Sequence, residues 1–225
     1  MNQLRHNTFN GIHKGLRCML YDTAQKIQHT NFADSEESEE TLQRIESVLL
    51  LFEHHGHHED HFLFPNIGPT DSTIVKELEK EHVKDHELSS GLQNAVNEYR
   101  KAGNKVDRAI IGKNLLMLFN EFVAFNLQHM NKEEQHINPI LWKNYTDEEI
   151  RAIDKKLVAN VDPSILMKSG EWLMKGQNYL ELFYWTNDLK HNAPPPVYEA
   201  VTNLGKHVYK EKWEVMMEKG ASAAV

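Results

Sequence analysis

The sequence has only one cysteine, Cys18, among 225 residues. An internal disulfide needs two cysteines, and multi-cysteine zinc or iron–sulfur sites need more, so all of these are excluded. The sequence also lacks a convincing run of alternating polar and apolar residues, which is the pattern of a half-buried strand. The absences therefore favour an all-α protein without cysteine-based cross-links.

Positive charge is scarce as well. Lys and Arg number 25 against 33 Asp and Glu, which gives a net charge of -8 and argues against nucleic acid or an anionic membrane as the main partner. The first 20 residues contain no unbroken apolar stretch. We therefore expect no signal peptide, no membrane span and a cytoplasmic protein.

Helical spacing dominates what is present. An apolar stripe from Phe9 to Leu20 predicts a first helix, and an acidic loop over residues 31–40, with Ser38 as cap, precedes the second. Pro65 and Gly103 predict the ends of the second and third helices. We place the later helices at about 40–64, 72–101 and 107–138. Their mostly short connections predict an antiparallel four-helix bundle.

The histidines divide the chain into two parts. Twelve of the 14 lie before residue 137. We therefore predict a bundle domain over residues 1–145 and a helical C-terminal extension over residues 146–225, with helices near 165–189 and 197–217. We expect this extension to pack on the bundle or to mediate self-association, so a homo-oligomer is one expectation.

One motif occurs twice, as His-x-x-x-Glu-[Asp/Glu]-x-x-x-x-Pro beginning at His55 and at His129. Residues four apart share one face of a helix, so each copy aims an imidazole and a carboxylate in the same direction. A third pair of the same spacing, two histidines, lies on the third helix, and one histidine lies on the apolar stripe of the first. The candidate metal ligands are His13, His55, Glu59, His82, His86, His129 and Glu133.

With this ordered set the chain resembles the hemerythrin-like family, also called the HHE cation-binding domain, over about residues 1–145. The resemblance implies two irons held by a lone His, then His-x-x-x-Glu, then His-x-x-x-His, then His with a carboxylate on successive helices. The seven candidate residues would fill those roles. Some members space the last carboxylate five residues after its His, which would select Glu134. The internal repeat favours Glu133.

Five further histidines lie near the motifs. Helical geometry turns His54, His57 and His61 away from the direction of His55 and Glu59, so we expect them in solvent. His58 and His136 lie nearer the predicted site. Either could support a ligand or replace one.

Imidazole and carboxylate ligands suit iron, zinc or manganese, and the resemblance makes iron the first choice. Two octahedral ions offer about twelve positions. Five imidazoles, two bridging carboxylates and a bridging oxo or hydroxo group leave one position for dioxygen or nitric oxide. The side chains that could form a dry wall beside it are Phe62, Leu118, Phe122 and Phe125.

Three functions remain at this stage. The leading interpretation is a non-haem di-iron protein that reversibly binds, stores or senses dioxygen or a related small ligand. The alternative, also implied by the resemblance, is an enzyme for nitric oxide or peroxide, or a factor for repair or delivery of iron, with His58 and His136 relaying protons. The third is a storage or structural site for zinc or a single ion. The sequence leaves open whether the protein is an enzyme.

Overall fold

The computed structural model describes residues 5–67 and 69–223, and within these ranges the chain is all-helical and contains no strand. The helices divide into two compact units. The first comprises Met1–Phe9 and Met19–Val161, and the second comprises Asn10–Cys18 and Asp162–Val225. Helix α1 (Asn10–His29) is continuous across this division. The all-α prediction is confirmed.

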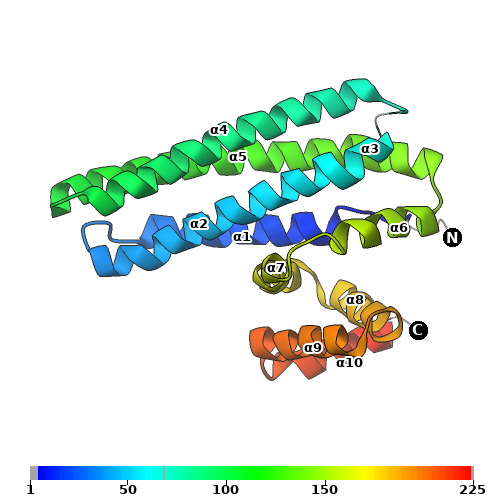
Figure 1. Ribbon diagram of the computed structural model, residues 1–225. Coiled ribbons are helices and arrows are strands. Elements are labelled where there is room, and N and C mark those ends of the chain that lie inside the picture. The colour runs from blue at the N-terminus through cyan, green and yellow to red at the C-terminus, as the bar shows by residue number, and fades with distance from the viewer. Residues whose placement is uncertain (1–4, 68, 224–225) are drawn as a thin grey trace. The chain divides into compact units, whose positions relative to one another are not determined.

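Within the first unit, long helices lie side by side (Figure 1). The second half of α1 pairs with α2 (Ser35–His58) through ion pairs of Asp22 with Arg44 at 3.0 Å and of Lys26 with Glu40 at 2.9 Å. Helix α4 (Ser72–Lys101) packs against α2 and against α5 (Lys105–Asn144). Because residues 102–104 alone join α4 to α5, these two helices run in opposite directions.

The second helix differs from the prediction at both ends. Its cap is Asp34, whose side chain accepts hydrogen bonds from the backbone N–H groups of Glu36 and Glu37, so most of the expected acidic loop is helical and Ser38 is buried. At the other end, Pro65 does not stop the helix. The chain continues through a π-helical turn, η1 (Glu59–Leu63), into α3 (Phe64–Ile67).

Proline is also tolerated in α5, which continues six residues past the predicted end, through Pro139, to Asn144. The reason is tertiary packing, because Ile137 and Leu141 on either side of Pro139 are fully buried. They belong to one apolar core together with residues from η1, α3, α4 and α6 (Asp147–Val158). This burial outweighs the hydrogen bond that a proline removes from a helix. Helix α6 thereby packs within the first unit through Ile150.

The second unit contains the first half of α1 with α7 (Pro163–Gly176), α8 (Tyr179–Asn192), α9 (Pro195–Tyr209) and α10 (Lys212–Ala223). The two long helices predicted here are each split. Asn178 caps α8 in a reciprocal capping box with Glu181, and Lys210 ends α9 with a φ of 49°. Gly176 meets α1 so closely that an added Cβ would lie 2.4 Å from the Lys14 carbonyl oxygen. The α1 segment that carries His13 is therefore held by α7.

Among the described helices, α5 is long and apolar enough to cross a membrane by length and composition alone. This is weak evidence for a span, because core helices of globular proteins pass the same test.

Candidate metal centre

Five separate stretches of helix carry the donor side chains, and the first is α1 with His13. His55 lies on α2, Glu59 opens the π-turn η1, His82 lies on α4, and α5 carries both His129 and Glu133. In η1 the Phe64 N–H donates to the carbonyl of Glu59, five residues earlier, instead of four. Such single-turn π-bulges are frequent at functional sites, and this one lies at a candidate ligand.

The first donor group contains Glu59, His82, His129 and Glu133. The Nε2 atom of His82 lies 3.4 Å from Oε2 of Glu59 and 3.8 Å from Oε1 of Glu133. The Nε2 atom of His129 lies 3.1 Å from Oε1 of Glu133. Two donors that are each about 2.1 Å from one ion are about 3.0 Å apart at right angles and about 3.4 Å apart in a tetrahedron. The separations of 3.4 and 3.1 Å fit ligands of a common ion, whereas the 3.8 Å from His82 to Glu133 is longer than either value.

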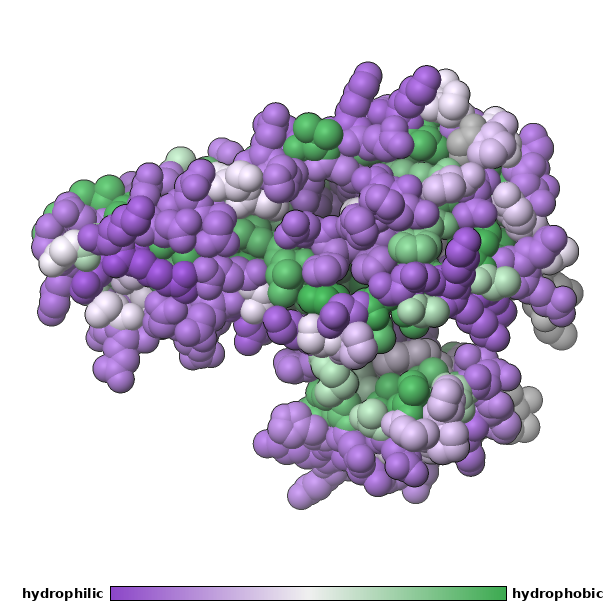
Figure 2. Space-filling view, viewed as in Figure 1, coloured by the Kyte–Doolittle hydropathy of each residue, from purple (hydrophilic) through white to green (hydrophobic). Residues whose placement is uncertain are grey.

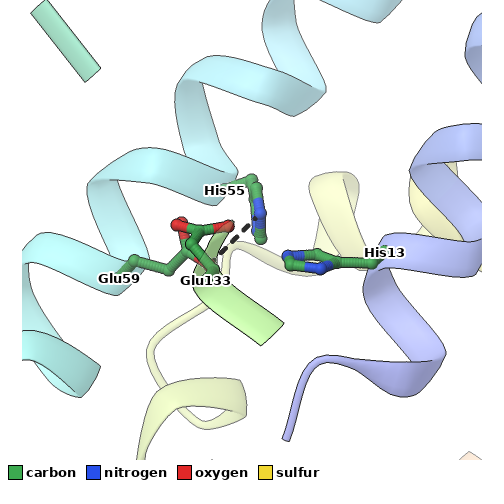
Figure 3. Close-up of side chains that lie close together, drawn as sticks. All are labelled: His13, His55, Glu59 and Glu133. Carbon is green, nitrogen blue, oxygen red and sulfur yellow. Dashed lines mark ion pairs between the residues drawn. The ribbon is translucent and has the colours of Figure 1, made fainter. Parts of the chain in front are cut away.

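The second group contains His13, His55 and the same two carboxylates, Glu59 and Glu133 (Figure 3). The His55 Nε2 lies 3.3 Å from Oε1 of Glu59. Within each group the ligand atoms all lie within 4.8 Å of one another. Two imidazole pairs thus share one pair of carboxylates, and each of the two groups could hold a metal ion.

Two imidazoles form hydrogen bonds to further carboxylates through Nδ1, the ring nitrogen that does not face the donor group. The Nδ1 atom of His82 lies 2.8 Å from Oδ1 of Asp60, and the Nδ1 atom of His129 lies 2.8 Å from Oε2 of Glu81. Because an ionised carboxylate only accepts hydrogen bonds, each Nδ1 carries the hydrogen. A neutral ring then has its lone pair on Nε2, directed at the donor group. Such partners fix the orientation of a metal-binding imidazole and raise its basicity.

Aromatic rings restrict the same two imidazoles. Phe64 stacks on His82 with ring centroids 5.6 Å apart, and Phe125 stacks on His129 at 6.1 Å. The interplanar angles are 7° and 8°. Each imidazole ring is therefore fixed both by a hydrogen bond and by packing. Its side chain would lose little further conformational freedom when a metal ion binds.

The electrostatics of the cluster favour positive charge. Burial disfavours the charged form of His82, but the neighbouring carboxylates of Asp60, Glu133 and Glu59 outweigh burial and raise its pKa to about 12. For His129, burial likewise acts downward, and Glu133, Glu59 and Glu81 outweigh it and raise the pKa. The side chains of Glu59 and Glu133 lie almost entirely out of solvent, with 3% and 0% exposed. Two buried carboxylates require positive charge close by. Protonated imidazoles can supply it, and so can a bound metal ion.

A cavity of about 200 Å³ reaches this cluster. Its lining includes the rings of His55, His82 and His129 and the buried carboxylate of Asp85, which accepts a hydrogen bond from Asn126 Nδ2 at 2.6 Å. Burial raises the pKa of Asp85, although the hydrogen bond from Asn126 acts in the opposite direction. The volume is enough for several water molecules or a small ligand, since a water occupies about 30 Å³ of liquid.

The structure brings together six of the seven residues that the sequence singled out. His86 belongs to neither donor group, because its side chain is exposed at the wall of the cavity. Glu133 belongs to both groups, whereas the half-buried Glu134 belongs to neither.

The expected dry wall is not the lining of this cavity. Phe52 lines the cavity, but the four apolar residues expected there do not: Phe62, Leu118, Phe122 and Phe125. His58 is buried beside Phe62 and His54, where desolvation lowers its pKa, and His136 is exposed. Of the three histidines expected in solvent, His57 and His61 are exposed and His54 is half-buried.

Sequence reasoning did not assign roles to Asp60 and Glu81. Asp60 was visible as the second acidic residue of the repeated motif, so the signal existed but was not linked to His82. Glu81 directly precedes His82 and serves the imidazole of another helix, which no local spacing indicates.

Comparisons with known proteins agree with a cation site. The family model described as the hemerythrin HHE cation binding domain matches residues 6–141. F-box/LRR-repeat protein 5 of Bos taurus is 22% identical over 205 residues, which cover 88% of this chain and 28% of that protein. Its counterpart in Mus musculus is 24% identical over 156 residues, 68% of this chain and 21% of that protein.

A plant protein is similar over much of the same region. Zinc finger protein BRUTUS-like of Arabidopsis thaliana is 22% identical over 163 residues, 72% of this chain and 13% of that protein. The chain thus spans less than a third of the length of these relatives. No solved structure gave a significant match.

Proposed function

Since the chain belongs to the hemerythrin HHE cation-binding family, we propose that it is an antiparallel four-helix bundle built around a non-haem di-iron centre that reversibly binds, stores or senses dioxygen or nitric oxide. One observation carries the proposal. The two imidazole pairs share Glu59 and Glu133, so the donor set divides naturally between two ions.

The number of donors supports open coordination positions. Two octahedral ions offer about twelve positions. The four imidazoles within the two groups fill four, two bridging carboxylates fill four, and a bridging oxygen fills two. Two positions remain, or one when His86 turns inward as the fifth imidazole. When bound, the irons would supply redox-active cations with room for a small ligand.

The protein's own residues hold and shield this centre. Asp60 and Glu81 accept the Nδ1 hydrogens of His82 and His129 and so keep each Nε2 directed at the donor group. The stacked Phe64 and Phe125 rings exclude water from the outer faces of the same imidazoles. The cavity beside them provides the space that a small ligand would need.

Anaerobic reconstitution with ferrous iron tests the proposal. We expect two irons per chain by elemental analysis, and a visible charge-transfer band that appears in air and disappears when oxygen is removed. The His129→Ala variant should lose both the band and part of the iron. Rapid irreversible oxidation in air would contradict reversible binding, and zinc or a single ion would contradict the di-iron centre.

The alternative is an enzyme that reduces nitric oxide or peroxide. It is favoured by the polar cavity lining, because both reductions consume protons and Asp85 places a carboxyl group in that lining. Steady turnover by the iron-loaded protein with a chemical reductant, lost in Asp85→Asn with iron content unchanged, would support the enzyme. An iron-loaded protein that gives no turnover under reducing conditions would rule out both reactions.

A further inference from the structure

Two histidines outside the donor groups face each other on the molecular surface. His57 and His61 are both exposed, and their ring centroids are 4.0 Å apart with an interplanar angle of 30°. The Nδ1 atom of His61 lies 2.8 Å from the carbonyl oxygen of His57. A carbonyl can only accept, so Nδ1 is the donor, and the lone pair of the neutral His61 ring is on Nε2.

A carboxylate continues the same stripe. Glu53 precedes His57 by four residues, one turn earlier on α2, and it is also exposed. Two imidazoles and a carboxylate thus follow one another at four-residue steps along α2 and η1. Pairs of histidines four apart on one helical face bind divalent metals, and imidazole suits iron, zinc, copper and nickel.

The stripe also borders the route to the donor cluster. Glu53 and His57 line the cavity that reaches His55, His82 and His129. Between them in the sequence, Gly56 lines the same cavity, and an added Cβ there would lie 3.4 Å from the His82 ring. An added Cβ would thus be in ordinary van der Waals contact with the ring, and a side chain longer than that of alanine would add atoms to the cavity lining beside His82.

We propose that Glu53, His57 and His61 form a surface site that captures a divalent metal ion and passes it through the cavity to the buried donors. Three exposed protein donors leave the ion's remaining positions to water, so this ion exchanges readily. The buried groups each offer four donors and hold their ions tightly. The proposal rests on the di-metal centre proposed above, since that centre is the destination of the ion.

Cobalt(II) is a suitable probe, because its visible absorption changes on binding to protein ligands. The metal-free 225-residue protein would be mixed with cobalt(II) in a stopped-flow instrument, and ions per chain would be counted before and after desalting. The wild type should carry one extra ion that desalting removes. The double variant His57→Gln, His61→Gln should lack this labile ion and fill its buried sites at least about threefold more slowly, because a local site raises the ion concentration at the cavity.

A matched control exists in the second unit. His191 is exposed and its Nδ1 donates to a backbone carbonyl four residues earlier, at 2.7 Å, as His61 does. His191→Gln should behave as the wild type, and Glu53→Gln should slow filling. Circular dichroism should show all variants folded, since every changed residue is exposed.

The outcomes are distinguishable. Equal labile-ion counts in the wild type and the double variant would overturn the proposal, as would a lost labile ion with no change in filling rate. Slower filling in the His191→Gln control would also overturn it. Fewer than two tightly held ions in the wild type would instead contradict the di-metal centre, because the labile ion is counted separately.

Discussion

Removing the charge of Asp60 tests how the carboxylates behind the imidazoles contribute to metal binding. Its Oδ1 lies 2.8 Å from the Nδ1 atom of His82. In Asp60→Asn the amide oxygen can still accept the Nδ1 hydrogen, so the orientation of the ring is kept and only the charge is lost. In Asp60→Ala both are lost. The two substitutions therefore separate charge from orientation.

The magnitude follows from the exposure of Asp60. Loss of a carboxylate or carbonyl partner behind a metal-binding imidazole typically reduces affinity about 10–100-fold, and each tenfold is about 1.4 kcal/mol. The Asp60 side chain is 33% exposed, so solvent screens its charge. We expect Asp60→Asn to weaken binding about tenfold, near the lower limit, and Asp60→Ala to approach the upper limit of about 100-fold.

The assay is competition for metal against a chelator of known affinity. Glu77→Gln is the control, because the substitution removes one negative charge, as Asp60→Asn does, at a side chain that is 55% exposed, pairs with Lys132 at 2.7 Å and belongs to neither donor group. Thermal unfolding of the metal-free variants checks that they remain folded. Wild-type affinity in both Asp60 variants, or an equal loss in Glu77→Gln, would refute a specific role of Asp60.

Two further predictions concern the ligands themselves. His82→Ala should lower the metal content by one ion per chain. His86→Ala should retain both ions with weaker binding, because His86 lies outside both donor groups. If elemental analysis shows that His86→Ala loses an ion, His86 is an essential ligand. Metal loading at pH 8 should release at least one proton per chain, because the raised pKa of about 12 keeps His82 protonated without metal and an imidazole must be neutral to bind. Affinity should accordingly rise with pH, and an indicator dye in weak buffer that shows no acidification would contradict this.

Much of the fold was predictable because its signals are local. The third helix was predicted over about residues 72–101 with Gly103 ending it, and these are the bounds of α4, which Asp71 caps at its start. The errors came where packing overrides local rules. Pro65, which was predicted to end the second helix, lies inside a helix that continues, and α5 runs through Pro139 beyond its predicted end near residue 138, because the flanking apolar residues are buried in one core.

The candidate site likewise has features that the sequence predicts and features that only packing between helices sets. His82 and His86 have the same chemistry and equivalent sequence context, and both were predicted to point inward. Four residues advance an α-helix by about 40° beyond one full turn and by about 6 Å. Whether the second histidine reaches the cluster therefore depends on how α4 is rotated against α2 and α5, which no spacing within α4 specifies. The π-turn at Glu59 is likewise a register change that local propensity did not indicate.

The sequence by itself determined that the chain is helical and that paired imidazoles and carboxylates occupy single helical faces, because a helix converts spacing into direction. Only the tertiary structure decided that Glu59 and Glu133 are shared between two histidine pairs, that Asp60 and Glu81 support imidazoles of other helices, and that His86 lies outside. These relations join separate helices, and the axial rotation and offset of each helix are set by packing of the whole core.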